Sequence, residues 1–311
     1  MFDYTILGAG AIGCVYGGRL AEAGHKVQLI TRSADLGNAI DRSGLVLEMD
    51  GAKTQSEPVA RTADKATESR VVIVLTKTFQ TKAAIEALQP QMSEQTVWVT
   101  LQNGLGNGTA LADLTGGPVL EGPAMMPARI VKPGHIWTQK PSESALGPYK
   151  DTDPSLAETI AAEISAAGIP HIFMPDARPV IWKKACFNLA MNAIAALTAG
   201  GPGLIAATKG LQQEAHLIAS EGADLAEAKG IAIDRDALAQ MIDWACATHI
   251  WHKPSMRQDI EAGALTEIDA LNGYIAAEAP KYDLAVPRNQ LLAHLVRARE
   301  TAPAYWAGKP A

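Results

Sequence analysis

One segment of the chain, residues 181–192 (IWKKACFNLAMN), carries polar side chains at a spacing that suits proton transfer. Lys184, Asn188 and Asn192 follow one another at intervals of four residues, so a helix would place them on one face. Their neighbours are almost all apolar, and polar groups on a core-like helix cost free energy unless something hydrogen-bonds to them. We expect this lysine–asparagine stripe to bind a polar, oxygen-rich small molecule. A solvated helix face, with Lys183 in water, is the alternative.

A lysine beside a carbonyl group can protonate the oxygen while a hydride reaches the carbon. Burial lowers the pKa of a lysine toward the working pH, which suits general acid–base chemistry. Lys184 is therefore the candidate proton donor, and the two asparagines would position the carboxylate and hydroxyl groups of the substrate. Residues 266–273 (TEIDALNG) supply a second polar set, in which Thr266 and Glu267 either begin a helix or serve the site.

A glycine-rich turn lies close to the N-terminus, where residues 8–13 (GAGAIG) match the pattern G-x-G-x-x-G between a strand-like and a helical run. Gly8 would permit a tight turn, Gly10 would let the backbone approach a pyrophosphate, and Gly13 would let the helix pack on the strand. The helix N-terminus would favour the anion. We predict a dinucleotide site here, against the alternative of a purely structural turn. The residues assigned to it are Gly8, Ala9, Gly10, Ala11, Ile12 and Gly13.

The residue that follows the second strand-like run indicates which dinucleotide binds. NAD enzymes usually place an acid there for the ribose 2′-hydroxyl, whereas this chain has Arg32 and no acid before Asp35. A guanidinium pairs well with a 2′-phosphate, so we predict NADP(H), with a solvated surface arginine as the alternative. Lys77 and Asn103 follow later strands, at the edge where such folds bind ligands. Strand-end lysines are common, however, and Asn103 also belongs to a turn, Gln102-Asn103-Gly104.

Strand-like and helical runs alternate through the first half of the chain, which predicts an α/β fold with a doubly wound parallel sheet of the Rossmann type. The strand-like runs are residues 4–7, 25–31, 70–76 and 96–101, and the helical ones are 11–23 and 78–88. Beyond about residue 150 alanine-rich helical runs dominate, at 155–167, 177–199, 211–229, 236–248 and 267–279. We predict an NADP-binding domain at 1–175 and an all-helical substrate and catalytic domain at 176–311, with a cleft between them.

Composition excludes several classes of protein. The 311 residues include 33 acidic and 27 basic ones, a net charge of −6 that gives no general attraction to nucleic acid or to anionic membranes. Residues 185–208 carry no charge, but two asparagines and a Gly-Gly-Pro-Gly break argue against a membrane span. Three scattered cysteines and seven scattered histidines indicate a reduced, cytoplasmic protein without a metal site. The expected partner is a small molecule, with a homodimer as a possible assembly.

Taken in order, these motifs resemble the ketopantoate reductase (2-dehydropantoate 2-reductase) family over nearly the whole chain. The matching elements are residues 8–13, Arg32, 72–77 (VIVLTK), 102–104, 182–184 (WKK) with Asn188 and Asn192, 255–259 (SMRQD), 266–269 (TEID) and 272–273. The resemblance implies a Rossmann domain followed by an all-α domain. It also implies the NADPH-dependent reduction of 2-dehydropantoate to pantoate, a step of pantothenate biosynthesis.

The resemblance also implies roles for individual residues. Lys184 would be the proton donor, and Glu267 would support the catalytic site and contact bound ligand. The implied substrate ligands are Asn103, Lys184, Asn188, Asn192 and Ser255. The implied cofactor ligands are the residues of the glycine turn, Arg32, Lys77, Asn103, Glu267 and the backbone at Ala128, which would lie near the nicotinamide. Ser255, taken from the sequence alone, is equally a residue that caps a helix.

Two loops differ from the family pattern and leave the substrate open. Residues 200–203 (GGPG) stand where the family often has another substrate-binding asparagine, and residues 122–126 (GPAMM) replace a loop usually rich in threonine. The two methionines indicate either a more apolar pocket wall or packing in the core. The alternatives are a relative that acts on a different 2-oxo acid or carbonyl, an enzyme like the β-hydroxyacid dehydrogenases, and a non-catalytic NADPH-binding regulator.

Overall fold

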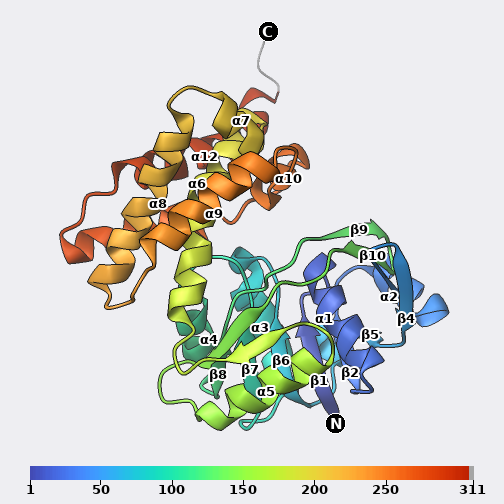
Figure 1. Ribbon diagram of the computed structural model, residues 1–311. Coiled ribbons are helices and arrows are strands. Elements are labelled where there is room, and N and C mark those ends of the chain that lie inside the picture. Colours follow the sequence, from blue (N-terminus) through green and yellow to red (C-terminus); the bar gives the residue numbers. More distant parts are fainter. Residues whose placement is uncertain (308–311) are drawn as a thin grey trace. The chain divides into compact units, whose positions relative to one another are not determined.

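The computed structural model (Figure 1) describes residues 1–307 and divides the chain into two units, Met1–Val180 and Ile181–Ala311. The division falls in the first turn of helix α6 (Arg178–Thr198), whereas the boundary expected from the sequence lies just before that helix.

The first unit is built on an eight-stranded sheet with the strand order β12-β11-β8-β7-β6-β1-β2-β5. The strands from β8 to β5 in that order run parallel, and β11 pairs antiparallel with β8 and parallel with β12. This confirms the predicted doubly wound parallel sheet and adds a reversed pair at one edge. The strands are β1 Phe2–Leu7, β2 Val27–Ile30, β5 Val59–Arg61, β6 Ser69–Val74, β7 Val97–Thr100, β8 Val119–Glu121, β11 Ser144–Pro148 and β12 His171–Phe173.

Helices cover both faces of this sheet (Figure 1). Helices α1 (Ala11–Glu22) and α5 (Pro154–Ala166) pack in one apolar core, and α3 (Thr81–Leu88) and α4 (Asn107–Thr115) pack in the other. The buried run of β6 alternates between the two cores, Val71 and Ile73 in one and Val72 and Val74 in the other. A strand that is buried on both faces reads as the continuous apolar run seen in the sequence.

A second, four-stranded sheet in this unit has the order β4-β3-β10-β9 and was not predicted from the sequence. Its strands are β3 Leu45–Met49, β4 Ala52–Ser56, β9 Ala128–Lys132 and β10 His135–Thr138. β3 and β10 add the buried residues Leu45, Leu47 and Ile136 to the core, and Ala128 of β9 packs against it while partly buried. Most residues of β4 and β9 are exposed, so their sequences lack the apolar alternation by which a strand is usually recognised.

The second unit is helical, as predicted. After α6 come α7 Pro202–Ala207, α8 Leu211–Ala228, α9 Arg235–Thr248, α10 Ser255–Glu261, α11 Asn272–Glu278 and α12 Pro287–Trp306. The helix expected at 267–279 is wrong as a single element, because a 3₁₀ turn at Ile268–Ala270 precedes α11 and Leu271 breaks the helical backbone between them. None of the helices in the described part of the chain has the length and apolar character needed to cross a membrane.

Candidate active site

The glycine turn lies at the carboxyl end of β1, where the strand order switches from β2 on one side to β6 on the other. Gly8 has a φ of +107°, and a Cβ atom there would lie 2.6 Å from the backbone nitrogen of Thr76. A Cβ on Gly13 would lie 2.1 Å from the carbonyl oxygen of Gly8, whereas one on Gly10 would meet nothing within 4 Å. Gly8 and Gly13 are therefore required by the turn itself, and Gly10 leaves open space beside the backbone.

The N-terminus of α1 suits an anion. Gly10 is its N-cap, no side chain caps the helix, and no acidic residue lies in its first turn. Arg32 follows β2 and is exposed, just before Ser33, which caps α2 (Ala34–Ser43) by accepting a hydrogen bond from the amide of Leu36 at 3.2 Å. Within residues 1–307 the Arg32 side chain makes no hydrogen bond or ion pair. Its charge is thus available to a ligand.

A buried glutamine, which sequence reasoning passed over as part of a turn, joins the two loops that carry Lys77 and Asn103. The Nε2 of Gln102 donates to the carbonyl oxygen of Thr76 at 2.8 Å and to Oγ1 of Thr81 at 2.7 Å. The carbonyl oxygen of Asn103 accepts a hydrogen bond from Nδ2 of Asn107 at 3.0 Å, which holds the turn. Lys77 and Asn103 are both partly buried and follow the neighbouring strands β6 and β7, as predicted.

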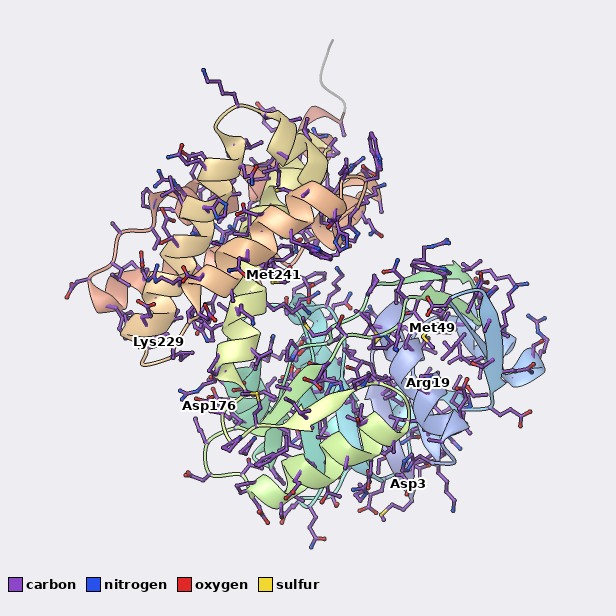
Figure 2. The ribbon with its side chains drawn as sticks, viewed as in Figure 1. Asp3, Arg19, Met49, Asp176, Lys229 and Met241 are labelled. Carbon is purple, nitrogen blue, oxygen red and sulfur yellow. The ribbon has the colours of Figure 1, made fainter. Side chains whose placement is uncertain are left out.

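The last residue of β8 is a titratable group that sequence reasoning missed. Glu121 ends β8, and its carboxylate packs so tightly on the first turn of α4 that a Cβ on Gly108 would lie 2.4 Å from it. Burial raises the pKa of Glu121 to about 7; Arg178 opposes the shift and Asp176 adds to it. Asp176, labelled in Figure 2, forms an ion pair at 2.7 Å with Arg178, the first residue of α6.

Of the two methionines in the loop at 122–126, Met126 is buried in the larger core of the sheet, so its role is packing. Met125 is partly buried, and its carbonyl oxygen accepts a hydrogen bond from the amide of Ser142 at 3.0 Å. Ala128 begins β9 and pairs with Thr138 of β10, which fixes its backbone in the second sheet.

The lysine–asparagine stripe lies on α6 as predicted, with its three side chains on one helical face. Asn188 and Asn192 are 9% and 7% exposed, yet within residues 1–307 neither carboxamide makes a hydrogen bond. Neither residue has a polar side-chain atom that is fully sealed from solvent and unbonded, so both carboxamides keep some access to solvent. A buried amide normally has a partner. Two neighbouring amides that lack a hydrogen-bond partner and can still be reached from solvent are suited to bind a polar ligand.

Lys184 and Glu267 form the titratable centre of the stripe. Burial lowers the pKa of Lys184 to about 8, and the charge of Glu267 acts in the opposite direction. Glu267 is only 7% exposed and lies just before the 3₁₀ turn that precedes α11. The structure therefore brings together Lys184 and Glu267, which are 83 residues apart in the sequence, and gives the lysine a pKa close to neutrality.

The structural alternatives for Thr266, Glu267 and Ser255 have different outcomes. Oγ1 of Thr266 accepts a hydrogen bond from the amide of Ile268 at 3.1 Å, so it does begin the 3₁₀ turn, whereas Glu267 makes no capping bond there. Ser255 is exposed at the first position of α10, whose N-cap is Pro254, so the expected alternative of a serine cap is wrong. Ser255 stays a predicted substrate ligand.

Close packing accounts for the glycines of the loop at 200–203. A Cβ on Gly201 would lie 2.4 Å from the carbonyl oxygen of His252, and one on Gly203 would lie 2.4 Å from the side chain of Ile250. The carbonyl oxygen of Gly200 accepts a hydrogen bond from Arg257 of α10 at 3.0 Å. This loop thus packs against the segment that leads to Ser255, and an asparagine at either of the crowded glycines would have to displace it.

Comparison with known proteins gives matches over both units. The family model "Ketopantoate reductase PanE/ApbA" matches residues 4–151, and the model of its C-terminal part matches residues 176–300. Proteins named 2-dehydropantoate 2-reductase from Pyrococcus horikoshii and Halobacterium salinarum are 31% and 29% identical to the chain. The match to the Pyrococcus protein covers 95% of this chain and 97% of that protein. The match to the Halobacterium protein covers 94% of this chain and 97% of that protein.

Solved structures are also similar to the chain over nearly its whole length. A PanE/ApbA family ketopantoate reductase from Ralstonia eutropha has a TM-score of 0.90 at 30% identity, over 97% of this chain and 99% of the other. A D-mandelate dehydrogenase solved with NADH and anilino(oxo)acetate has a TM-score of 0.88 at 25% identity, over 96% of this chain and 99% of the other.

Proposed function

Because the chain belongs to the ketopantoate reductase family, we propose that it reduces 2-dehydropantoate to pantoate with NADPH, and that Lys184 gives the proton. The observation that supports this proposal best is the stripe of α6. It combines a partly buried lysine, a nearby carboxylate and two buried carboxamides that have no partner among the described residues. Such a set suits a small molecule with a carbonyl, a carboxylate and a hydroxyl group.

The chain's own residues fit a dinucleotide phosphate. The open space at Gly10 lets a phosphate approach the backbone, and the uncapped N-terminus of α1 supplies amide donors. Arg32, and with it Lys77, would contact the adenosine 2′-phosphate region, while Asn103 and the backbone at Ala128 would lie near the nicotinamide. Because the related D-mandelate dehydrogenase was solved with NADH, the preference for NADPH rests on Arg32. In Arg32→Ala, kcat/KM for NADPH should fall at least tenfold while that for NADH changes little; an equal change for both would refute the preference.

The reaction requires one hydride and one proton, and the bound nicotinamide supplies the hydride. Lys184, as the ammonium, would hydrogen-bond to the keto oxygen and transfer its proton to that oxygen as the carbonyl carbon is reduced. Asn188, Asn192 and Ser255 would bind the carboxylate and the hydroxyl group, which keeps the carbonyl aimed at Lys184. Glu267 stabilises the charged form of Lys184, so the proton is present when substrate binds. The neutral amine left after transfer regains a proton from solvent.

A second candidate is the reduction of a 2-oxo acid with a bulkier, apolar side chain. It is supported by the likeness to D-mandelate dehydrogenase and by the glycine loop at 200–203, which lacks the asparagine expected from the family pattern. The experiment that decides is NADPH oxidation with 2-dehydropantoate beside pyruvate, 2-oxoisovalerate and phenylglyoxylate. A kcat/KM at least tenfold higher for 2-dehydropantoate than for the other acids supports the first proposal. A kcat/KM at least tenfold higher for phenylglyoxylate than for 2-dehydropantoate supports the second. If NADPH binds and none of these acids is reduced, the result would instead support a non-catalytic NADPH-binding regulator.

The remaining assignments concern place and assembly. We expect the enzyme to act in the cytoplasm, where its three buried cysteines, Cys14, Cys186 and Cys246, stay reduced; all three are free thiols in the structure. The homodimer stays a prediction, and light scattering on the purified protein measures it.

A further inference from the structure

Two buried asparagines of the second unit differ from those of the stripe because their amide NH₂ groups have partners, although Oδ1 of Asn272 is buried without a hydrogen bond. Asn272 is the first residue of α11, Asn289 lies in the first turn of α12, and both are 0% exposed. The Nδ2 of Asn272 donates to the carbonyl oxygen of Leu189 in α6 at 3.1 Å and to Oδ1 of Asn289 at 2.9 Å. One side chain thus joins the helix of the stripe to two other helices.

The chain of hydrogen bonds continues to a buried carboxylate. The Nδ2 of Asn289 donates to the carbonyl oxygen of Ile218 at 3.0 Å and to the carboxylate of Glu221 in α8 at 2.8 Å. Glu221 also accepts the backbone amides of Arg288 and Asn289, at 3.1 and 2.9 Å. These amides lie in the first turn of α12 and have no partner inside the helix, so the carboxylate caps it.

The chemistry of the partners fixes the orientation of both amide groups. A backbone carbonyl accepts hydrogen bonds only, and so does an ionised carboxylate. If either amide were reversed, its oxygen would face Leu189 or Ile218 oxygen to oxygen. Asn272 and Asn289 are therefore held in one orientation, and an aspartate at either position would lose the donors on which the connection depends.

The position of the bond on α6 links it to catalysis. Leu189 follows Asn188 directly and lies between Lys184 and Asn192 in the chain. Inside the helix its carbonyl oxygen accepts the amide four residues on, so Asn272 adds a second hydrogen bond from outside. The same pair of helices, α6 and α11, is joined by an edge-to-face contact between Trp182 and Tyr274, with ring centres 6.1 Å apart.

The segment that carries Glu267 and Asn272 runs from Thr266 to Glu278, the end of α11. It is tied to α12 where the amide of Thr266 donates to Glu300 at 2.8 Å and where Asp269 pairs with Arg297 at 2.6 Å. At its far end, Glu278 of α11 pairs at 3.0 Å with Lys229 (labelled in Figure 2), the residue that follows α8. The segment is thus fixed to α8 and α12, and Asn272 fixes it to α6.

We propose that Asn272 is a positioning residue that sets the place of Glu267 relative to Lys184 and the two stripe asparagines, by holding the Leu189 carbonyl of α6. The inference rests on the proposed function only in taking Lys184 as the proton donor. Asn272 itself touches no reacting group. Its loss lets α6 shift or turn against the segment of Glu267, and a misplacement of about 1 Å in an active site can cost about a hundredfold in rate.

The test uses Asn272→Ala and Asn272→Ser, the second of which keeps one short donor and is the variant to use if the first does not fold. The matched control is Asp234→Ala, which removes a helix cap of the same unit, a bond to the amide of Ala237 at 2.9 Å on α9. Two quantities are measured: kcat and KM for reduction, and the titration of Lys184 by NMR with ¹³C-labelled lysine, assigned with Lys184→Ala. Thermal unfolding shows that each variant is folded.

We expect kcat to fall at least tenfold in the Asn272 variants, with KM for NADPH changed less than twofold. The Lys184 titration should move to lower pH because the charge of Glu267 no longer favours the ammonium as strongly. Asp234→Ala should change neither. In a double-mutant cycle, Asn272→Ala should shift the titration little further once Glu267→Gln is present.

Three results would overturn the proposal. They are an unshifted Lys184 titration in a folded Asn272 variant, additive shifts in the cycle, or a loss of kcat no larger than that of Asp234→Ala. The titration also separates this proposal from the proposed function. If no 2-oxo acid is reduced by the unmodified enzyme, the function fails, while the Lys184 titration in the Asn272 variants still decides on positioning.

Discussion

The rate of reduction should fall as the pH rises through about 8, because only the ammonium form of Lys184 has a proton to give. Burial lowers the pKa of Lys184 to about 8, against an ordinary value of 10.5. With that pKa, roughly 90% of Lys184 is charged at pH 7 and roughly 10% at pH 9. We therefore expect kcat for reduction to drop about tenfold between pH 7 and pH 9. Oxidation of the 2-hydroxy acid, which needs the neutral amine, should become faster over the same range.

The assay is the initial rate of NADPH oxidation at saturating substrate and constant ionic strength. Lys184→Arg provides the sharpest comparison, because a guanidinium stays charged over the whole range and any residual rate should lose its alkaline fall. Lys183→Ala is the matched control: it removes the adjacent lysine, which lies off the stripe, and should keep the fall at the same pH. Glu121→Gln is the second control, since burial raises the pKa of that carboxyl to about 7.

A flat profile from pH 6.5 to about 9.5, or a fall that persists at the same pH in Lys184→Arg, would refute the role of Lys184 as the proton donor. A fall that disappears in Glu121→Gln would assign it to that carboxyl instead.

Three further predictions concern stability and cofactor binding. Lys184→Met should raise the melting temperature at pH 7 by a few degrees, because a folded-state pKa below the unfolded one makes the charged lysine destabilising; calorimetry should show the gain shrinking as the pH rises from about 8 to 10.5, and an unchanged gain would contradict the cause given. Gly8→Ala should weaken NADPH binding at least tenfold by calorimetry, because the turn needs a positive φ and its Cβ would meet the backbone of Thr76; unchanged affinity would show that the turn adapts. Gln102→Leu should cost about 1–3 kcal/mol of unfolding free energy in urea, because the bonds to Thr76 and Thr81 are lost in a buried site; a loss under about 0.5 kcal/mol would mean that water replaces the amide.

The features that the sequence predicts correctly depend on short stretches of chain. The turn at residues 8–13 depends on close backbone contacts. A side chain on Gly13 would meet the carbonyl oxygen of Gly8, and one on Gly8 would meet the backbone of Thr76, just after the neighbouring strand β6. The strand at 70–76 was recognisable because burial on both faces demands a continuous apolar run. The stripe was recognisable because the helical repeat alone places Lys184, Asn188 and Asn192 on one face.

What the sequence does not predict depends on contacts between distant segments. The small sheet of β3, β4, β9 and β10 has mostly exposed outer strands, so its pattern is set by pairing rather than by burial. The break at Leu271 divides a run that propensity alone makes one helix, because Asn272 starts α11 where it can reach the carbonyl of Leu189, 83 residues away in the sequence. The proximity of Lys184 and Glu267 has the same origin.

The second unit contains four buried asparagines that composition and pattern cannot tell apart, and their partners separate them into two kinds. Both hydrogens of the amide are used in Asn272 and in Asn289, and all four bonds go to groups that only accept or to each other. In Asn188 and Asn192 no described residue provides a bond. An unpaired buried amide costs about 1–3 kcal/mol, so the second pair lowers the stability of the fold. In the first pair every amide hydrogen is bonded, and the one buried atom without a hydrogen bond is the acceptor Oδ1 of Asn272. A ligand can supply the missing bonds of Asn188 and Asn192, and for that reason we propose that these two bind the substrate, while Asn272 and Asn289 belong to the scaffold that places them.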